Sequence, residues 1–245
     1  MPRMPRKKSE SGYFHVVSKG SGGQVLFVER SDYICFLQNL KKYGEEFNVS
    51  ICAYCLMDNH VHILVHDGDD NLSTFMRKLD SAYASYYNRK YQRIGHVFLD
   101  RFKSKPIDSE EYLLTAFHYI LNNPPNANLC AAADYEWSSY KKYGQKESFV
   151  NTEIFCELLG DWDDYVAYLD TEQEDGYFEY ESIRRDDAWA LEIIRTELGV
   201  ASGTALQSWS REKLYAALRL LREKGLSVRQ IERLTGINRG IIQKA

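Results

Sequence analysis

The chain has 245 residues, of which 44% are hydrophobic and 27% are charged, and its formal net charge is −4. This composition is typical of a folded protein with a sizeable core, and it excludes a disordered or collagen-like chain. No stretch approaches the roughly 18 apolar residues that a membrane-spanning helix needs, so we expect no membrane partner. The five cysteines are an odd number in a chain without a recognisable secretory signal. We therefore expect reduced thiols and a cytoplasmic location.

The charge is unevenly distributed and divides the chain into three segments. Residues 1–150 carry 19 basic and 17 acidic side chains, residues 151–187 carry 2 and 13, and residues 188–245 carry 10 and 5. This pattern predicts a first domain over 1–150, an acidic linker with a short helix over 151–187, and a helical domain over 188–245.

The elements predicted for the first domain follow the order of one α+β fold. Hydrophobic periodicity predicts strands at 13–18, 49–56, 57–65 and 96–107, and helices at 33–43, 72–91 and 109–122. The order strand, helix, strand, strand, helix, strand predicts a ferredoxin-like antiparallel sheet with one face covered by helices. We expect Asp108 to cap the third helix, and Pro124 and Pro125 to stop it.

Two of the six histidines, His60 and His62, lie two residues apart in a β-branched, apolar run. Residues i and i+2 of a strand point to the same face, so both imidazoles can converge on one cation. A His-x-His pair alone is not specific, because a structural or solvent-facing role fits the same spacing.

Tyr119 and Asn123 lie four residues apart at the end of the third predicted helix, and hence on one face of it. A tyrosine hydroxyl can act as a nucleophile when local charge activates it. The alternatives are a packing role for Tyr119 and a helix-capping role for Asn123.

Basic residues are concentrated between positions 71 and 106, where only two acidic residues occur. They are Arg77, Lys78, Arg89, Lys90, Arg93, Arg101, Lys103 and Lys105. A basic stripe beside aromatic residues suits the backbone and bases of single-stranded DNA or of a hairpin. A solvated helix face is the alternative.

The last segment resembles a helix-turn-helix. A helix is predicted over 211–224, and Thr235 and Gly236 form a turn before a short final helix, on which Arg239 and Lys244 can face a DNA groove. Duplex DNA is therefore a candidate partner of this domain. A simple three-helix interaction module is the alternative.

Four blocks of the first domain resemble the signature blocks of the single-tyrosine HUH transposases, and particularly the REP-associated tyrosine transposases. They are Met57–His62, Asp100–Ser104, Tyr119–Pro124 and Glu136–Tyr140. The blocks occur in family order, and the resemblance covers about residues 10 to 145.

The resemblance implies a DNA transposase that cuts single-stranded DNA and joins itself to the 5′ phosphate through Tyr119. It also implies Mg²⁺ or Mn²⁺ held by His60, His62 and Asn123, and a palindromic repeat hairpin as the DNA partner. A nucleoid-associated location follows, and a homodimer is left open. One alternative is a domesticated DNA-binding regulatory protein without turnover. Another is a replication initiator or relaxase, for which a lysine would be expected where Asn123 stands.

Overall fold

The computed structural model describes residues 8–171, 187–200, 203–224, 226 and 228–244. They belong to two compact units, which divide between residues 178 and 179 and are described separately below. Among the helices of the described residues, none is both long and apolar enough to cross a membrane.

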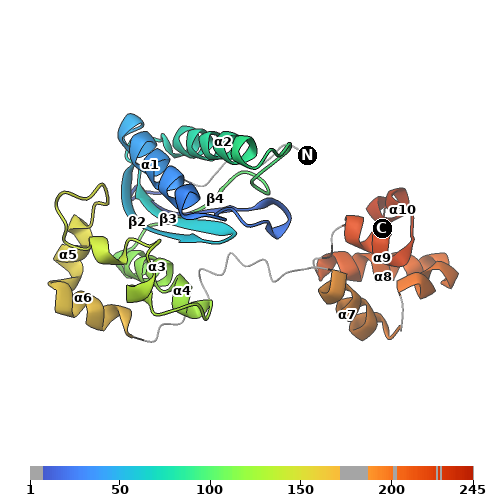
Figure 1. Cartoon of the computed structure of the whole chain (residues 1–245). Coiled ribbons are helices and arrows are strands. Elements are labelled where there is room, and N and C mark those ends of the chain that lie inside the picture. The colour runs from blue at the N-terminus through green and yellow to red at the C-terminus, as the bar shows by residue number, and fades with distance from the viewer. Residues whose placement is uncertain (1–7, 172–186, 201–202, 225, 227, 245) are drawn as a thin grey trace. The chain divides into compact units, whose positions relative to one another are not determined.

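The first unit is built on one antiparallel sheet of four strands (Figure 1). The strands are β1 (Tyr13–Lys19), β2 (Ser50–Met57), β3 (His60–His66) and β4 (Lys103–Ile107), and their order across the sheet is β2-β3-β1-β4. This is the ferredoxin-like α+β order, so the predicted fold class is confirmed.

Two long helices, α1 (Arg30–Glu46) and α2 (Leu72–Lys90), cover one face of the sheet. Their apolar sides interlock over alternate residues of the strands, with Phe36, Phe75 and Ile63 fully buried between the layers. Helix α1 begins with a capping box, in which Glu29 and Asp32 satisfy the first backbone amides.

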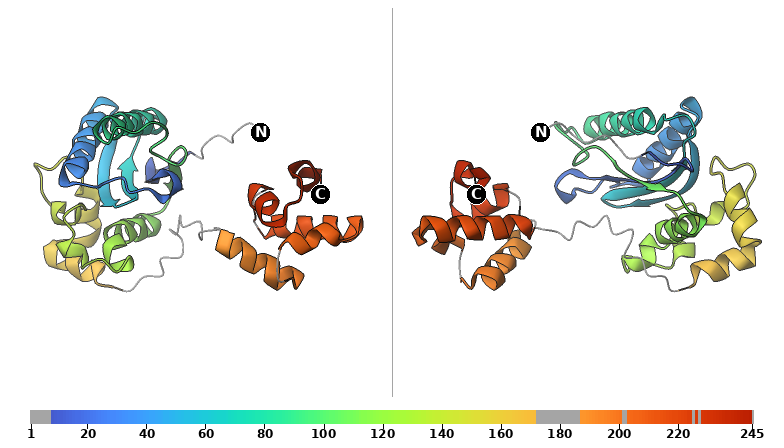
Figure 2. Two further views of the ribbon diagram at one scale, coloured as in Figure 1. Left: turned by 45° about the vertical axis from the view of Figure 1, so that its right-hand side comes forward. Right: turned by 180° about the vertical axis from the view of Figure 1, so that it is seen from behind.

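The opposite face is also covered, so the prediction that helices cover only one face was wrong (Figure 2). Against it pack α3 (Glu110–Leu121), α4 (Asn123–Asn126), α5 (Glu153–Leu159) and α6 (Trp162–Leu169). The strand residues on this face include the buried Cys55 and Leu64. Because both faces of the sheet are apolar, both must be shielded from water.

Helices α5 and α6 belong to the first unit, although the sequence analysis assigned them to the acidic linker. Phe155 on α5 stacks on Phe117 of α3 with ring centroids 3.9 Å apart, and neither ring is more than 1% exposed. The predicted domain boundary was placed before α5 because this segment is acidic. The acidic side chains lie only on the outward faces of α5 and α6. The rest of the predicted linker, residues 172–186, lies outside the described residues.

The fourth strand is shorter than predicted, because a turn at Asp100 and Arg101 interrupts residues 96–107. The Asp100 carboxylate accepts a hydrogen bond from the Arg101 amide at 2.8 Å, and Phe98 forms only an isolated bridge to Gly20. The cap of α3 also differs. The Ser109 side chain accepts a hydrogen bond from the backbone amide of Tyr112. The Asp108 carboxylate instead accepts a hydrogen bond from the backbone amide of Glu10.

The Glu136–Tyr140 block runs along the exposed edge of β2. The Trp137 carbonyl accepts the Leu56 amide at 2.9 Å, and the Ser139 amide donates to the Tyr54 carbonyl at 2.9 Å. The Ser139 hydroxyl also accepts the Tyr54 amide. This segment thereby satisfies the edge of the sheet, which would otherwise be open to pairing with another chain.

The second unit is helical. It contains α7 (Asp187–Leu198), α8 (Arg211–Glu223), α9 (Val228–Thr235) and α10 (Arg239–Lys244). Leu218, Ile231 and Ile242 are fully buried at its centre. Gly236 lies between α9 and α10 with φ +71°, the left-handed conformation that favours glycine in a helix-ending turn.

The packing of α5 on α3 makes a testable claim about stability. We expect Phe155→Ala to lower the free energy of unfolding of the first unit by about 3–5 kcal/mol, because it leaves a cavity beneath Phe117. Leu129 is exposed, so Leu129→Ala is the control and should lower the free energy of unfolding by less than about 0.5 kcal/mol. Urea unfolding of the full chain measures both. Equal, small effects would show that α5 is not part of the folded first unit.

Candidate active site

The register of the sheet gathers polar side chains on the α3 face. Val17 of β1 pairs with His62 of β3 and with Lys103 of β4, and Lys19 pairs with His60. Directly paired residues of antiparallel strands point to the same face. This face of the sheet therefore presents His60 and His62 beside two lysines.

A third histidine, which the sequence analysis did not select, joins them. His15 of β1 lies within hydrogen-bonding distance of His62, with Nε2 and Nδ1 2.9 Å apart, and the two rings are at most 2% exposed. This contact occupies Nδ1 of His62, so the Nε2 atom of that ring is the one directed away from His15. No local sequence signal links positions 15 and 62, because only the strand register brings them together.

Tyr119 and Asn123 meet these histidines from α3 and the start of α4. The Tyr119 ring lies edge-on to His62, with centroids 5.6 Å apart, and 5.9 Å from His15. Asn123 donates from Nδ2 to the Tyr119 carbonyl at 3.0 Å, and its side chain also hydrogen-bonds with His60. The structure thus brings together all four residues of the predicted catalytic and metal set.

The three imidazoles are kept neutral by burial. Desolvation, with a smaller contribution from Lys105, lowers the pKa of His15 to about 3. Desolvation and the nearby Lys19 lower the pKa of His60 to about 4, and desolvation with the neighbouring histidines lowers that of His62 well below its ordinary value. Neutral imidazole is the form that binds a metal ion.

The donor set suits an open cation site. His60 donates from Nδ1 to Asn59 at 2.7 Å, and this hydrogen bond orients the ring. Two imidazoles and one amide oxygen leave room for phosphate and water, as Mg²⁺ or Mn²⁺ requires. In the described part of the chain, no three His, Cys, Asp or Glu side chains are arranged as a complete metal site.

The predicted DNA-binding residues fall into two groups. By register, Lys103 and Lys105 of β4 lie on the same face as the histidines, and the Lys105 ammonium also lies over the Tyr112 ring, 4.8 Å from its centroid. The second group, on α2 and after it, lies across the sheet from Tyr119: Arg77, Lys78, Arg89, Lys90, Arg93 and Arg101. Lys19 belongs with the first group and was missed by the sequence analysis.

Lys90 differs from the others because it is held by carboxylates. Its ammonium lies 2.6 Å from Asp32 and 3.0 Å from Glu29. Asp32, fully buried, also accepts hydrogen bonds from the hydroxyls of Tyr86 and Tyr91. Lys90 thereby ties α2 to the start of α1. The arrangement gives this lysine a structural partner within the fold.

The tyrosines of α2 are packed against the other face of the sheet. The Tyr83 and Tyr87 hydroxyls donate to the backbone carbonyls of Leu26 and Val25. Both rings lie in the core between α1, α2 and the sheet. These contacts give Tyr83 and Tyr87 a packing role, whereas Tyr119 lies beside His15 and His62.

In the second unit, Arg239 and Lys244 are exposed on α10.

Comparisons with known proteins agree on the first domain. Residues 10–123 match the family model described as IS200-like transposase. The structure of the REP-associated tyrosine transposase bound to a REP hairpin is similar, with a TM-score of 0.51 and 16% sequence identity over 58% of this chain and 84% of that one. A protein assigned as a transposase from Deinococcus radiodurans R1 matches at 18% identity over 49% of this chain and 97% of that one, with a TM-score of 0.34. No curated protein matches the chain.

The fold and the arrangement of Tyr119 beside the histidines are consistent with the matched family of transposases. Residues 10–123 are similar to the IS200-like transposase family. The similarity to the REP-associated enzyme shows a shared fold. The match to the family model supports a role in DNA transposition for this domain.

The buried neutral histidines predict a specific dependence of stability on pH. The unfolded chain protonates histidine below about pH 6.5, whereas folded His60 stays neutral until about pH 4. The unfolded state therefore binds more protons in this window, and the free energy of unfolding should fall as the pH is lowered from 6.5 towards 4. Urea unfolding between pH 7 and pH 5 measures this loss. We expect His15→Gln to make it shallower, and an unchanged slope would contradict the neutral cluster.

Proposed function

We propose that the first domain cleaves and rejoins single-stranded DNA through a covalent bond between Tyr119 and a 5′ phosphate. The observation that carries the proposal is the convergence of Tyr119, His60, His62 and Asn123 at one place on the sheet. The four side chains come from three elements of the fold, β3, α3 and α4, and packing alone would not require this combination of residue types.

In the proposed reaction, the Tyr119 hydroxyl oxygen attacks the phosphorus of a phosphodiester. The bond from phosphorus to the 3′ oxygen breaks, the phenol loses its proton, and the 3′ oxygen leaves as a hydroxyl. The resulting 5′-phosphotyrosine conserves the bond energy, so that attack by another 3′ hydroxyl can rejoin the strand. The reverse step releases Tyr119 unchanged.

A divalent cation, Mg²⁺ or Mn²⁺, would be held by His60, His62 and Asn123. When bound, it would polarise the scissile phosphate and offset its negative charge. His15 would orient His62 through their 2.9 Å contact. Asn123 would place its amide relative to the nucleophile through its hydrogen bond to the Tyr119 carbonyl.

The DNA partner proposed is a single strand that carries a hairpin. The name of the similar REP-associated structure specifies a REP hairpin, and a hairpin with a single-stranded flank offers both a recognised shape and a cleavable strand. Lys19, Lys103 and Lys105 share the face of the sheet with the histidines and would contact the phosphates near Tyr119.

For the second unit, we propose binding to duplex DNA through a helix-turn-helix formed by α9 and α10. Arg239 and Lys244 are exposed on α10, and the left-handed Gly236 makes the turn compact. Substitution of Arg239 and Lys244 would leave the core of the second unit intact, because its core contains the buried Ile231 and Ile242.

The nucleophile is tested by removing one oxygen. We expect Tyr119→Phe to abolish the covalent DNA adduct and to leave hairpin binding nearly unchanged, because the substitution alters neither charge nor ring volume. Labelled hairpin DNA from the gene flanks is incubated with Mn²⁺ and resolved by denaturing electrophoresis. Tyr87→Phe is the matched control and should keep the adduct. An adduct that persists in Tyr119→Phe would move the nucleophile elsewhere, whereas hairpin binding without an adduct in the wild type would favour a regulatory DNA-binding protein.

The cation site is tested by removing its donors. His60→Ala and His62→Ala should each lower the cleavage rate roughly 100-fold or more, because the loss of one donor weakens binding of the cation and displaces the phosphate. Asn123→Ala should cost less, because water can replace an amide oxygen. His15→Ala should lower Mn²⁺ affinity about 10- to 100-fold, as expected for a residue that orients a ligand, and His15→Gln should restore part of it. Undiminished cleavage in excess EDTA would overturn the metal-dependent reaction.

A further inference from the structure

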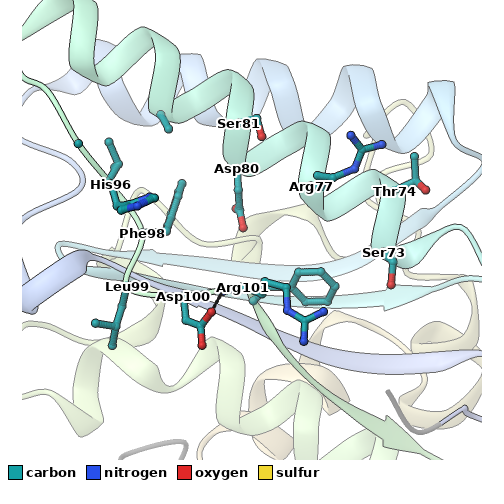
Figure 3. A pocket seen from close by; sticks show the side chains of 14 residues that line it. Ser73, Thr74, Arg77, Asp80, Ser81, His96, Phe98, Leu99, Asp100 and Arg101 are labelled. Carbon is teal, nitrogen blue, oxygen red and sulfur yellow. Dashed lines mark hydrogen bonds between the residues drawn. The ribbon is translucent and has the colours of Figure 1, made fainter. Parts of the chain in front are cut away.

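A large cleft of the first unit lies apart from the tyrosine site, on the other side of the sheet. It is formed between α2 and residues 95–102, and its volume is about 770 Å³ (Figure 3). This lies within the range of about 300–1,000 Å³ that is usual for ligand sites. The reaction proposed above does not use this cleft.

A single carboxylate projects from α2 into the middle of the cleft. Figure 3 shows Asp80 pointing towards the sheet, between Arg77 of the same helix and the 95–102 segment. Its two oxygens accept from one hydroxyl, that of Ser18, at 3.2 and 3.0 Å. Among the described residues, no cation forms an ion pair with this carboxylate. Burial raises the pKa of Asp80 to about 7, with the Ser18 hydroxyl acting in the opposite direction. A desolvated carboxylate with so few donors costs stability, and such groups are concentrated at functional sites.

The rest of the cleft combines cationic, aromatic and hydroxyl groups. Arg77 and Arg101 are exposed along it, and Phe98 lies half-buried beside Asp80. Arginines bind phosphates, and an aromatic ring stacks on a base. Leu99, at the rim, is 64% exposed, which leaves an apolar surface next to the cleft.

The cleft and the tyrosine site lie beside the same strand. Ser18, which holds Asp80, is on β1 between Val17 and Lys19, whose side chains face the histidines instead. The 95–102 segment leads directly into β4, the edge strand that carries Lys103 and Lys105. A DNA strand that crosses this edge would pass from one site to the other along a continuous series of basic side chains.

We propose that this cleft binds an unpaired guanine of the DNA substrate, whose N1–H and N2–H₂ groups donate to the two oxygens of Asp80. Guanine is the base that presents two adjacent donors on one edge, which matches a carboxylate. Phe98 would stack on the base, and Arg77 and Arg101 would bind the flanking phosphates. The inference rests on the proposed function, because it takes single-stranded DNA as the ligand.

The experiment measures binding of the full chain to fluorescent single strands in EDTA, where cleavage does not contribute. The probes are an oligothymidylate of about 20 nucleotides, longer than the roughly 4–16 that a single-strand-binding fold covers, and the same strand with one central guanine, inosine, adenine or cytosine. We expect the guanine probe to bind roughly 5- to 150-fold more tightly than oligothymidylate. Inosine, which lacks the N2 amino group, should lose part of this advantage.

Asp80→Asn should abolish the preference for guanine, because the amide replaces one acceptor with a donor. Asp100→Asn is the matched control. It removes the same charge from an exposed residue that lines the same cleft, and it should keep the preference. At pH 8, Asp80→Asn is expected to melt no lower than the wild type, because it removes a desolvated charge. The inosine probe tests the inference without any change to the protein.

Equal binding of all probes by the wild type would overturn the inference, as would a preference for adenine or cytosine. An equal loss of preference in Asp80→Asn and Asp100→Asn would also overturn it. Adduct formation by Tyr119 on hairpin DNA is measured in parallel. An adduct without a guanine preference refutes only the proposal that the cleft binds guanine. A guanine preference without an adduct refutes only the proposed cleavage reaction.

Discussion

The antiparallel pairing of β1 with β3 is the constraint on which the rest of the site depends. It places Val17 opposite His62 and Lys19 opposite His60, and it brings Nε2 of His15 to 2.9 Å from Nδ1 of His62. A shift of one residue in this register would turn the imidazoles towards α1 and α2 and would remove apolar side chains from that layer. The burial of apolar side chains in both layers therefore fixes the geometry of the proposed site.

Helix α3 completes the site because its own position is fixed from two sides. It packs on the sheet through its buried face, and Phe155 stacks on Phe117 from α5. Tyr119 lies on this helix two residues beyond Phe117, and Asn123 binds back to its carbonyl. Rigid packing of this kind would hold the proposed nucleophile close to the geometry that covalent catalysis requires.

Much of the fold could be predicted from the sequence, because period-2 and period-3.6 patterns are local properties. They predicted the element order and hence the sheet, and the His60–His62 spacing predicted a shared face. The features that could not be predicted from the sequence depend on contacts between residues far apart in the chain. The role of His15 follows only from the strand register, and the packing of α5 and α6 was hidden by their acidic outer faces. Likewise, a linear stripe of basic residues could not reveal that Arg77 and Lys103 lie on opposite sides of the sheet.

The central claim is that chemistry occurs at Tyr119 beside the buried histidines. It is tested most directly by isolating the covalent protein–DNA product, digesting it with protease and nuclease, and locating the modified residue by mass spectrometry. The account predicts a single 5′-linked nucleotide phosphate on the peptide that contains Tyr119. A nucleotide on any other residue, or a 3′ linkage, would contradict it.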